Sequence, residues 1–184
     1  MNAPLHSFEP SVLIETAAAR VSRAAPGARL SLQARGDLPP LNAALGLDLP
    51  TRIGRRARAG ALEAICLGPE EWMLHAPEAQ AVEILSACAE VYASRPRSLV
   101  DVSGRETTFV IDGPRAAELL TLGCARDIDG IAVGEGRRTA FDGVTVILWR
   151  DGETSFRMDC WHSFAPHVQH LLEIGCRELA AETI

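Results

Sequence analysis

The chain has 184 residues and a formal net charge of −6; its 47% hydrophobic and 23% charged residues are typical of an ordinary globular protein. This length allows one large domain or two small lobes around a buried core. The acidic balance argues against broad nucleic-acid binding, which needs a basic surface. All 18 residues counted as Lys or Arg are arginines, so a lysine Schiff base and a Walker A loop are both excluded.

The terminal and cysteine patterns indicate where the protein works. The first ten residues, MNAPLHSFEP, have neither a basic stretch nor an apolar core, so we expect no signal peptide. The longest strongly apolar run, Val144–Trp149, is too short to cross a bilayer. Five scattered cysteines without C-x-x-C spacing predict buried free thiols: Cys66, Cys88, Cys124, Cys160 and Cys176. The sequence therefore predicts a cytoplasmic protein without a membrane partner.

The first sixty residues predict one helix, one strand and an irregular region. Apolar residues near helical spacing predict a helix over 10–24, ended by Pro26-Gly27. Residues 28–35 alternate apolar and polar side chains, as a half-buried strand does. Three prolines and four glycines make much of 36–60 irregular, with a short helix expected near Leu41–Leu45.

The middle of the chain has clearer punctuation. Strands are expected over 61–67 and 71–76, joined by a turn at Gly68-Pro69. Pro77 suits the first turn of a helix that runs to about residue 93. Another strand is expected over 99–102. The helix is expected to bury Val82, Leu85, Cys88, Ala89 and Tyr92.

With the strand over 99–102, the second half predicts two strands, a helix, three strands and a helix. Asp112-Gly113-Pro114 is typical of a helix start, and Gly123 is typical of a residue just after a helix end. Asp142-Gly143 is the strongest hairpin signal in the chain, and Asp151-Gly152 indicates a second turn. The expected strands are 107–111, 138–141, 144–150 and 155–160; the final helix is 163–179, and the earlier one buries Ala116, Leu119 and Leu120.

This order predicts an α+β fold made of two related lobes with mixed or antiparallel sheets and exchanged strands. The lobes are residues 1–97, which include the Pro/Gly/Arg-rich loop, and residues 98–184, with the order ββαβββα; they are expected to pack as two lobes or as one compact domain. The segment WMLHAPEAQAVEIL has the pattern of TFVIDGPRAAELL. A Rossmann-type sheet is disfavoured because the strands follow one another through tight turns.

Two motifs resemble ligand-binding sites. Gly134-Glu135-Gly136 contains G-x-G, but a strand follows where a dinucleotide fingerprint needs a helix. The group Cys160, His162, His167 and His170 is the best metal candidate, although no carboxylate has zincin-like spacing and histidine pairs on exposed helix faces are common. We therefore assign no metal ligand.

Three other groups have a functional and a structural interpretation. Asp101 and Arg105 flank a turn containing Ser103, for which fixing the turn is a commoner role than nucleophilic catalysis. The basic run Arg52, Arg55, Arg56 and Arg58 is either a docking surface for an acidic partner or polyanionic cofactor tail, or a solvated loop. Trp72, Trp149 and Trp161 are expected in the core, although Trp161 at a strand end is also placed to face a partner.

Three ordered blocks carry a family resemblance. They are LGPEEWMLHAP (67–77), VDVSGRETTFVIDGPRAAELLTLGCARDID (100–129) and WHSFAPHVQHLL (161–172). Together they resemble the gamma subunit of heterotetrameric sarcosine oxidase, with its L-G-P-x-E-W, V-D-V-S-x-R-x-T, G-P-R-A-x-x-L-L and R-S-F-A patterns. Two departures stand out: His162 replaces the arginine of R-S-F-A, and Ala125-Arg126 replace the Pro-Leu of G-C-P-L-D.

The resemblance implies a small accessory chain, a non-catalytic subunit of an oxidoreductase complex, with a fold similar to the folate-binding domain of aminomethyltransferases. That complex oxidises sarcosine to glycine and passes the one-carbon unit to tetrahydrofolate. FAD, FMN, NAD and tetrahydrofolate are expected in partner subunits, the partners being the alpha, beta and delta subunits. No catalytic, cofactor-binding or metal residue is assigned to this chain. When isolated, the chain is expected to expose an apolar patch or to self-associate.

Two alternatives remain open at this point. The small subunit of an N-methylglutamate dehydrogenase-type complex is a close relative of the same kind of chain. A free-standing folate-dependent one-carbon transferase would use the same fold, with Asp101, Arg105 or a pocket carboxylate at its site. A fold-family resemblance alone does not separate these functions.

Overall fold

The computed structural model describes residues 9–93 and 96–182. Six of its strands form one sheet in the order β1 (Ser11–Glu15), β2 (Arg20–Arg23), β8 (Glu106–Asp112), β11 (Ser155–Trp161), β10 (Val144–Arg150) and β9 (Gly136–Phe141). Five strands form the other in the order β4 (Arg56–Ala59), β5 (Leu62–Gly68), β6 (Glu71–Ala76), β3 (Ala28–Ala34) and β7 (Arg97–Asp101). All neighbouring strands pair antiparallel.

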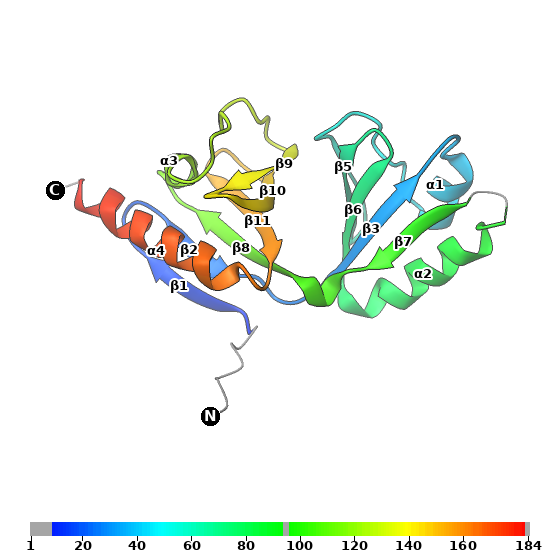
Figure 1. Cartoon of the computed structure of the whole chain (residues 1–184), viewed down its shortest axis with the longest axis horizontal. Coiled ribbons are helices and arrows are strands. Elements are labelled where there is room, and N and C mark those ends of the chain that lie inside the picture. The colour runs from blue at the N-terminus through cyan, green and yellow to red at the C-terminus, as the bar shows by residue number, and fades with distance from the viewer. Residues whose placement is uncertain (1–8, 94–95, 183–184) are drawn as a thin grey trace.

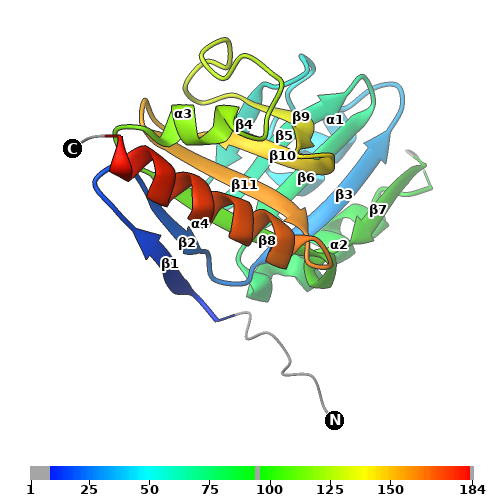
Figure 2. The same ribbon diagram turned by 60° about the vertical axis from the view of Figure 1, so that its left-hand side comes forward.

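The two sheets face each other, and helices cover their outer faces (Figures 1 and 2). Helices α3 (Ala116–Thr121) and α4 (Ala165–Ala181) pack on the six-stranded sheet around a core that includes Phe109 and Phe156. Helices α1 (Pro39–Leu45) and α2 (Ala81–Glu90) pack on the five-stranded sheet. Short 3₁₀ turns occupy Glu78–Gln80 and Ser103–Arg105. No helix in the described ranges is long and apolar enough to span a membrane.

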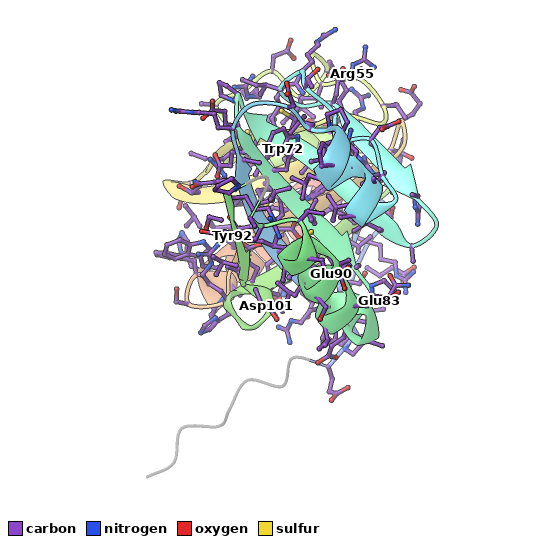
Figure 3. The ribbon with its side chains drawn as sticks, turned by 90° about the vertical axis from the view of Figure 1, so that its right-hand side faces the viewer. Arg55, Trp72, Glu83, Glu90, Tyr92 and Asp101 are labelled. Carbon is purple, nitrogen blue, oxygen red and sulfur yellow. The ribbon has the colours of Figure 1, made fainter. Side chains whose placement is uncertain are left out.

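Side chains along a strand of the five-stranded sheet point alternately toward the covering helices and toward the other sheet. Figure 3 views this side and labels Trp72 on β6 and the exposed Glu83 and Glu90 on α2. Trp72 is buried in the core beneath the helices, and its indole Nε1 donates to the carbonyl of Pro50 at 2.6 Å. The other face of β6 carries Met73 and His75 toward the six-stranded sheet.

After β1, the described chain forms two topologically equivalent units that exchange their first strands. The first unit is β2-β3-α1-β4-β5-β6-α2, and the second is β7-β8-α3-β9-β10-β11-α4. Within each unit the leading strand leaves its own sheet: β2 pairs with β8, and β7 pairs with β3. The two sheets then have the same strand order from β4 to β7 and from β9 to β2.

The exchange confirms the predicted α+β class with exchanged strands, but it corrects the predicted correspondence between segments of the two halves. The sequence pattern aligned the β6–α2 segment with the β8–α3 segment. By position in the sheets, β6–α2 instead corresponds to β11–α4, and β8–α3 corresponds to β3–α1. The exchange also means that 1–97 contributes β1 and β2 to the sheet of 98–184, while β7 joins the sheet of 1–97.

The predicted helix over 10–24 is wrong, because the segment forms the β1–β2 hairpin. The Thr16 hydroxyl accepts the amides of Ala18 and Ala19 and donates to the Ala19 carbonyl, which closes a turn that interrupts any helix. Pairing of β2 with β8 buries Val21 completely. Tertiary pairing therefore overrides the helical spacing of the apolar residues.

Most later elements lie where the sequence predicts them, with one error in orientation. The Asp142-Gly143 hairpin forms with φ of 46° and 79°, as a type I′ turn requires. Helix α2 ends at Glu90, earlier than predicted, and buries Ala81, Ile84 and Cys88. Of its predicted buried residues, Leu85 is half-buried, whereas three are exposed: Val82, Ala89 and Tyr92.

The exchange requires close contact between Gly113 and the β1–β2 turn. Gly113 has φ of 139°, and a Cβ there would lie 2.7 Å from the Cα of Ala19 and 2.9 Å from the carbonyl oxygen of Ala18. We therefore predict that Gly113→Ala lowers the free energy of unfolding by about 2–4 kcal/mol in a urea titration. Gly104→Ala is the matched control, because a Cβ at Gly104 meets nothing within 4 Å; equal losses in both variants would contradict the packing.

Candidate functional site between the two sheets

The interface between the sheets is polar for much of its extent. Alternation along β5 sends Leu62, Ala64 and Cys66 toward the helices and leaves Glu63 and Ile65 facing the other sheet. The apolar part of the interface is a small cluster: Ile65, Leu67, Met73, Val102, Ile147 and Trp149. Charged side chains fill the remainder, so this interface is where buried chemistry could reside.

Asp159 on β11 is the centre of the first polar group. Its side chain is fully buried, and its Oδ1 accepts a short hydrogen bond from the Thr108 hydroxyl. Its Oδ2 accepts the Trp149 indole N–H at 2.6 Å and lies 3.2 Å from His75 Nε2. Arg29 on β3 places its Nε 3.9 Å from Oδ1 and donates to the Thr108 hydroxyl at 2.6 Å.

This environment fixes the charge states of Asp159 and His75. Burial by itself raises the pKa of Asp159, but His75, Arg29 and the Thr108 hydroxyl outweigh it, and the pKa lies well below its usual range. Burial lowers the pKa of His75, and Asp159 offsets this only in part. At neutral pH we therefore expect an ionised Asp159 compensated by Arg29, with a neutral His75 beside it.

A second group forms a closed ring of four charges across the sheets. Arg56 on β4 bonds to Glu63 on β5 and lies 2.7 Å from Asp151 Oδ1. Arg157 on β11 contacts Glu63 Oε2 at 2.8 Å and Asp151 Oδ2 at 2.5 Å. Each carboxylate thus meets both guanidiniums, and the pKa values of Glu63 and Asp151 are lowered because the two arginines outweigh the cost of burial.

Trp149 joins the two groups. The guanidinium carbons of Arg56 and Arg157 lie 5.1 Å and 4.8 Å from the centre of its ring. On another side, the His75 ring is tilted against it, with 4.5 Å between the centroids. Since the Trp149 N–H also bonds to Asp159, this completely buried indole contacts both polar groups of the interface.

Two further contacts close the periphery of the interface. Arg138 on β9 forms a bidentate pair with Glu71 on β6, at 2.9 and 2.5 Å. Next to β4, the Gly136 amide donates to the Gly54 carbonyl at 3.0 Å, and Arg55 pairs with Glu135 at 3.1 Å. Glu135 is the middle residue of the rejected G-x-G motif, and its buried carboxylate also pairs with Arg137 at 2.8 Å.

The Asp101–Arg105 turn is a structural corner between β7 and β8. Asp101 Oδ1 accepts the Ser103 amide at 2.9 Å and the Ser103 hydroxyl at 2.6 Å, and both bonds lower the pKa of Asp101. The Ser103 hydroxyl in turn accepts the amide of Arg29 at 2.9 Å. Arg105 lies over the Trp161 ring and 3.3 Å from Glu106, rather than pairing with Asp101.

The metal candidates do not converge. Cys160 is buried in the helix-side core, whereas His162 Nδ1 lies 3.2 Å from the Arg105 carbonyl and His167 Nε2 lies 2.9 Å from Asp142. His170 is exposed on α4. In residues 9–93 and 96–182, no group of three or more His, Cys, Asp or Glu side chains is placed to hold a metal ion.

Burial makes four of the five cysteines poor nucleophiles. All five are buried and free. Burial raises the pKa of Cys160 to about 12 and that of Cys176 to about 11, and it also raises the pKa of Cys66 and Cys88. Because the thiolate is the nucleophile, these four side chains are poor candidates for covalent catalysis at neutral pH.

The basic run divides between the interface and the surface. Arg56 belongs to the charge ring, and Arg55 pairs with Glu135, so the solvated-loop interpretation is wrong for Arg56. Arg58 donates to the Gly60 carbonyl from an exposed position. Trp72 and Trp149 are in the core as expected, while Trp161 is 47% exposed.

The sequence reasoning did not single out the groups that matter most here, which are Asp159, His75, Glu63, Arg29, Arg157 and Asp151. Their signal is the charged residue at alternate positions of otherwise apolar strands, as in Met158-Asp159-Cys160. That pattern normally indicates a solvent-facing side of a sheet, and only the second sheet turns it into a buried interface.

The comparisons with known proteins agree with this architecture. Sarcosine oxidase subunit gamma from Corynebacterium sp. (strain U-96) is 31% identical over 147 residues, covering 78% of this chain and 71% of the relative. The corresponding subunit from an Arthrobacter species is 32% identical over 149 residues, with the same coverage. That from Corynebacterium sp. (strain P-1) is 29% identical over 167 residues. No protein-family model matches the chain.

Two solved structures have a similar fold. A chain of heterotetrameric sarcosine oxidase from Corynebacterium sp. U-96 superposes with a TM-score of 0.80 and 27% identity, covering 92% of this chain and 89% of that one. The glycine cleavage system aminomethyltransferase from Bartonella henselae gives a TM-score of 0.58 at 13% identity, covering 82% of this chain and 44% of that one.

The paired lobes with exchanged strands thus define an α+β protein of the aminomethyltransferase-like fold. Within that class, the chain belongs to the family of sarcosine oxidase gamma subunits. The expected family and fold are both confirmed. The His162 and Ala125-Arg126 departures from the family pattern lie at exposed positions outside the core clusters.

The charge states predict a fall in stability with acid. Because the pKa of His75 is lower in the folded state, the unfolded chain takes up a proton first as the pH falls below 6.5, and stability is lost. Asp159 acts in the same direction below about 3.8, its ordinary value. We predict that His75→Gln flattens the dependence of unfolding free energy on pH between 7 and 5.

The control for this measurement is His170→Gln, which changes an exposed histidine on α4. This variant should keep the slope of the wild type. Urea titrations at a series of pH values give both slopes. An unchanged slope in His75→Gln would mean that His75 has the same pKa in the folded and the unfolded chain, and would contradict its lowered pKa in the interface.

The ring of four charges predicts measurable coupling between the sheets. A double-mutant cycle with Glu63→Ala and Arg157→Ala should give a coupling energy of about 1–3 kcal/mol, because both side chains are largely buried. The same cycle on Arg35 and Glu70, which pair at 2.9 Å in an exposed position, should give less than about 1 kcal/mol. Similar coupling energies in the two cycles would show that the ring contributes no more than a surface pair.

Proposed function

We propose that this chain is the gamma subunit of a heterotetrameric sarcosine oxidase, a non-catalytic subunit that supports assembly. The assembled enzyme would carry out flavin-dependent oxidative demethylation of sarcosine to glycine, with transfer of the one-carbon unit to tetrahydrofolate. Alpha, beta and delta subunits would be its partners and would hold FAD, FMN, NAD and tetrahydrofolate. The observation that carries the proposal is the match to a heterotetrameric sarcosine oxidase chain over nearly the whole length of both.

The state of the polar interface supports a structural role. Asp159 is fully buried, and its two oxygens are already engaged by Thr108, Trp149 and His75. Glu63 and Asp151 each contact two arginines. A general base needs access to a substrate proton, and these carboxylates are instead committed to holding the sheets together.

The surface offers a candidate contact for a partner subunit. Trp161 and Phe164 are 47% and 45% exposed at the junction of β11 and α4, and the Phe164 amide donates to the Trp161 carbonyl at 2.9 Å. Arg105 lies 5.0 Å from the Trp161 ring centre. Exposed tryptophan and arginine side chains are over-represented among residues that dominate protein–protein affinity.

The proposal predicts co-purification. Co-expression with the large flavoprotein subunits should give a stable complex by size exclusion, with sarcosine-dependent peroxide formation. A chain that never co-elutes with them would contradict the proposal. A chain that instead co-elutes with subunits oxidising N-methylglutamate in preference to sarcosine would replace it with the related dehydrogenase assignment.

The exposed aromatic residues provide a sharper version of the test. Trp161→Ala with Phe164→Ala should weaken association with the complex at least about tenfold, as expected for residues that carry binding energy. Val82→Ala is the matched control, since Val82 is 74% exposed but lies on α2. Equal affinity of both variants would exclude the Trp161 surface as the contact while leaving the subunit assignment intact.

A further inference from the structure

Three arginines gather around the buried carboxylate of Glu135 at one edge of the interface between the sheets. Two of them lie on the loop between α1 and β4, and the third lies on β9; together with Ile53 they are called the arginine patch: Arg52, Ile53, Arg55 and Arg137. Arg55 Nε lies 3.1 Å from one oxygen of Glu135, and Arg137 Nη2 lies 2.8 Å from the other. A hydrogen bond from Arg137 lowers the pKa of Glu135, and the charges of Arg55 and Arg52 lower it further. One carboxylate thus faces three guanidiniums, so the patch keeps an excess of positive charge.

The loop that carries Arg52 and Arg55 is fixed by its backbone. The Arg55 amide donates to the Arg52 carbonyl at 3.0 Å, and the Gly54 amide donates to the Cys66 carbonyl at 2.8 Å. Gly54 has φ of 86°, and a Cβ there would lie 1.3 Å from Arg137 Nη1, so the Arg137 guanidinium packs directly over the loop. The arginines are therefore presented on a held turn, and a partner that binds them has little loop entropy to overcome.

The patch combines accessible charge with accessible apolar surface. Arg52 is exposed and forms no ion pair with any residue that the structure describes. The Arg55 side chain is 55% exposed despite its contact with Glu135, and Ile53 between the two arginines is 49% exposed. Guanidiniums bind carboxylates and phosphates, whereas an exposed isoleucine gains only from an apolar neighbour. A ligand that carries both anionic groups and an apolar side chain therefore fits best.

The charge of the whole chain restricts this ligand to a short anionic one. The net charge is −6, and Figure 3 shows Arg55 at the top of the view, with Glu83, Glu90 and Asp101 toward the opposite end. A nucleic acid or an anionic membrane needs a broad basic face and would also meet this acidic surface. A protein segment carries its carboxylates within a few residues and supplies the apolar side chain as well.

We propose that the arginine patch binds an acidic segment of a partner subunit. Carboxylates of that segment pair with Arg52 and Arg55, and one of its apolar side chains packs against Ile53. Arg137 has a positioning role, because its two terminal nitrogens already donate to the Gly136 carbonyl and to Glu135. The inference rests on the proposed function, which supplies the partner, and it adds a contact whose chemistry differs from that of the exposed aromatic pair.

The first test measures association of the full chain with the large flavoprotein subunits over a series of salt concentrations. Arg52→Glu should weaken association at least about tenfold at low salt, and the loss should shrink at high salt, because salt screens exposed charges. Arg177→Glu is the matched control: it reverses the charge of an exposed arginine on α4 and should associate as the wild type does.

Two results of this test would overturn the arginine patch as a contact. One is wild-type affinity of Arg52→Glu in a complex that forms, and the other is a loss that stays the same at high salt. Both results would leave the subunit assignment intact. If the wild-type chain associates with no flavoprotein subunit, the subunit assignment fails, and a peptide titration then decides on the patch.

That titration follows the amide NMR signals of the isolated full chain. The probe is the peptide acetyl-Glu-Leu-Glu-Glu-amide, which should shift Ile53, Gly54 and Arg55 saturably in the millimolar range. The Gln-Leu-Gln-Gln analogue should bind at least about tenfold more weakly, and the Glu-Gly-Glu-Glu analogue about threefold more weakly. Absence of saturable shifts, or inorganic phosphate binding at these amides as tightly as the acidic peptide, would overturn the proposal of an acidic protein segment.

Discussion

The buried charge of Asp159, compensated across the interface by Arg29, is the interaction on which the rest of the structure depends. Asp159 belongs to β11 in one sheet and Arg29 to β3 in the other, so neither sheet can bury its own charge alone. Removing one partner of such a pair is far more costly than the net stability the pair contributes, because it leaves a buried charge without compensation. The pair therefore fixes how the sheets meet.

The strand exchange and the polar interface reinforce each other. Exchange links each unit covalently to the sheet of the other, since the chain passes from one sheet to the other between β2 and β3 and again between β7 and β8. The ring of Arg56, Glu63, Arg157 and Asp151 then requires one register between the sheets. Apolar packing tolerates sliding of one sheet over the other better than paired charges do. The charges therefore specify how the sheets are placed, while Trp149 and its apolar neighbours fill the space between them.

Local signals determined how much of this fold could be predicted from the sequence. The Asp142-Gly143 hairpin and the buried face of α3 follow from turn chemistry and apolar spacing, which need no distant partner. The β1–β2 hairpin does not follow from local signals, because the pairing of β2 with β8 joins residues about ninety positions apart. The polar interface could not be predicted for a related reason. Asp159 and Glu63 have the spacing of solvent-facing strand residues, and only the second sheet buries them. The family resemblance, by contrast, depended on short turn-forming blocks that persist in the structure.

The buried charged groups of this chain pair with one another, so we expect them to take no part in catalysis by the complex. The most direct measurement is sarcosine turnover per flavin in a complex assembled with His75→Gln in this chain. We expect the turnover of each assembled complex to equal that of the wild type, even if less complex forms, because His75 is buried between the sheets. A loss of turnover with assembly and flavin content intact would show that the interface takes part in the reaction, and would contradict the structural role.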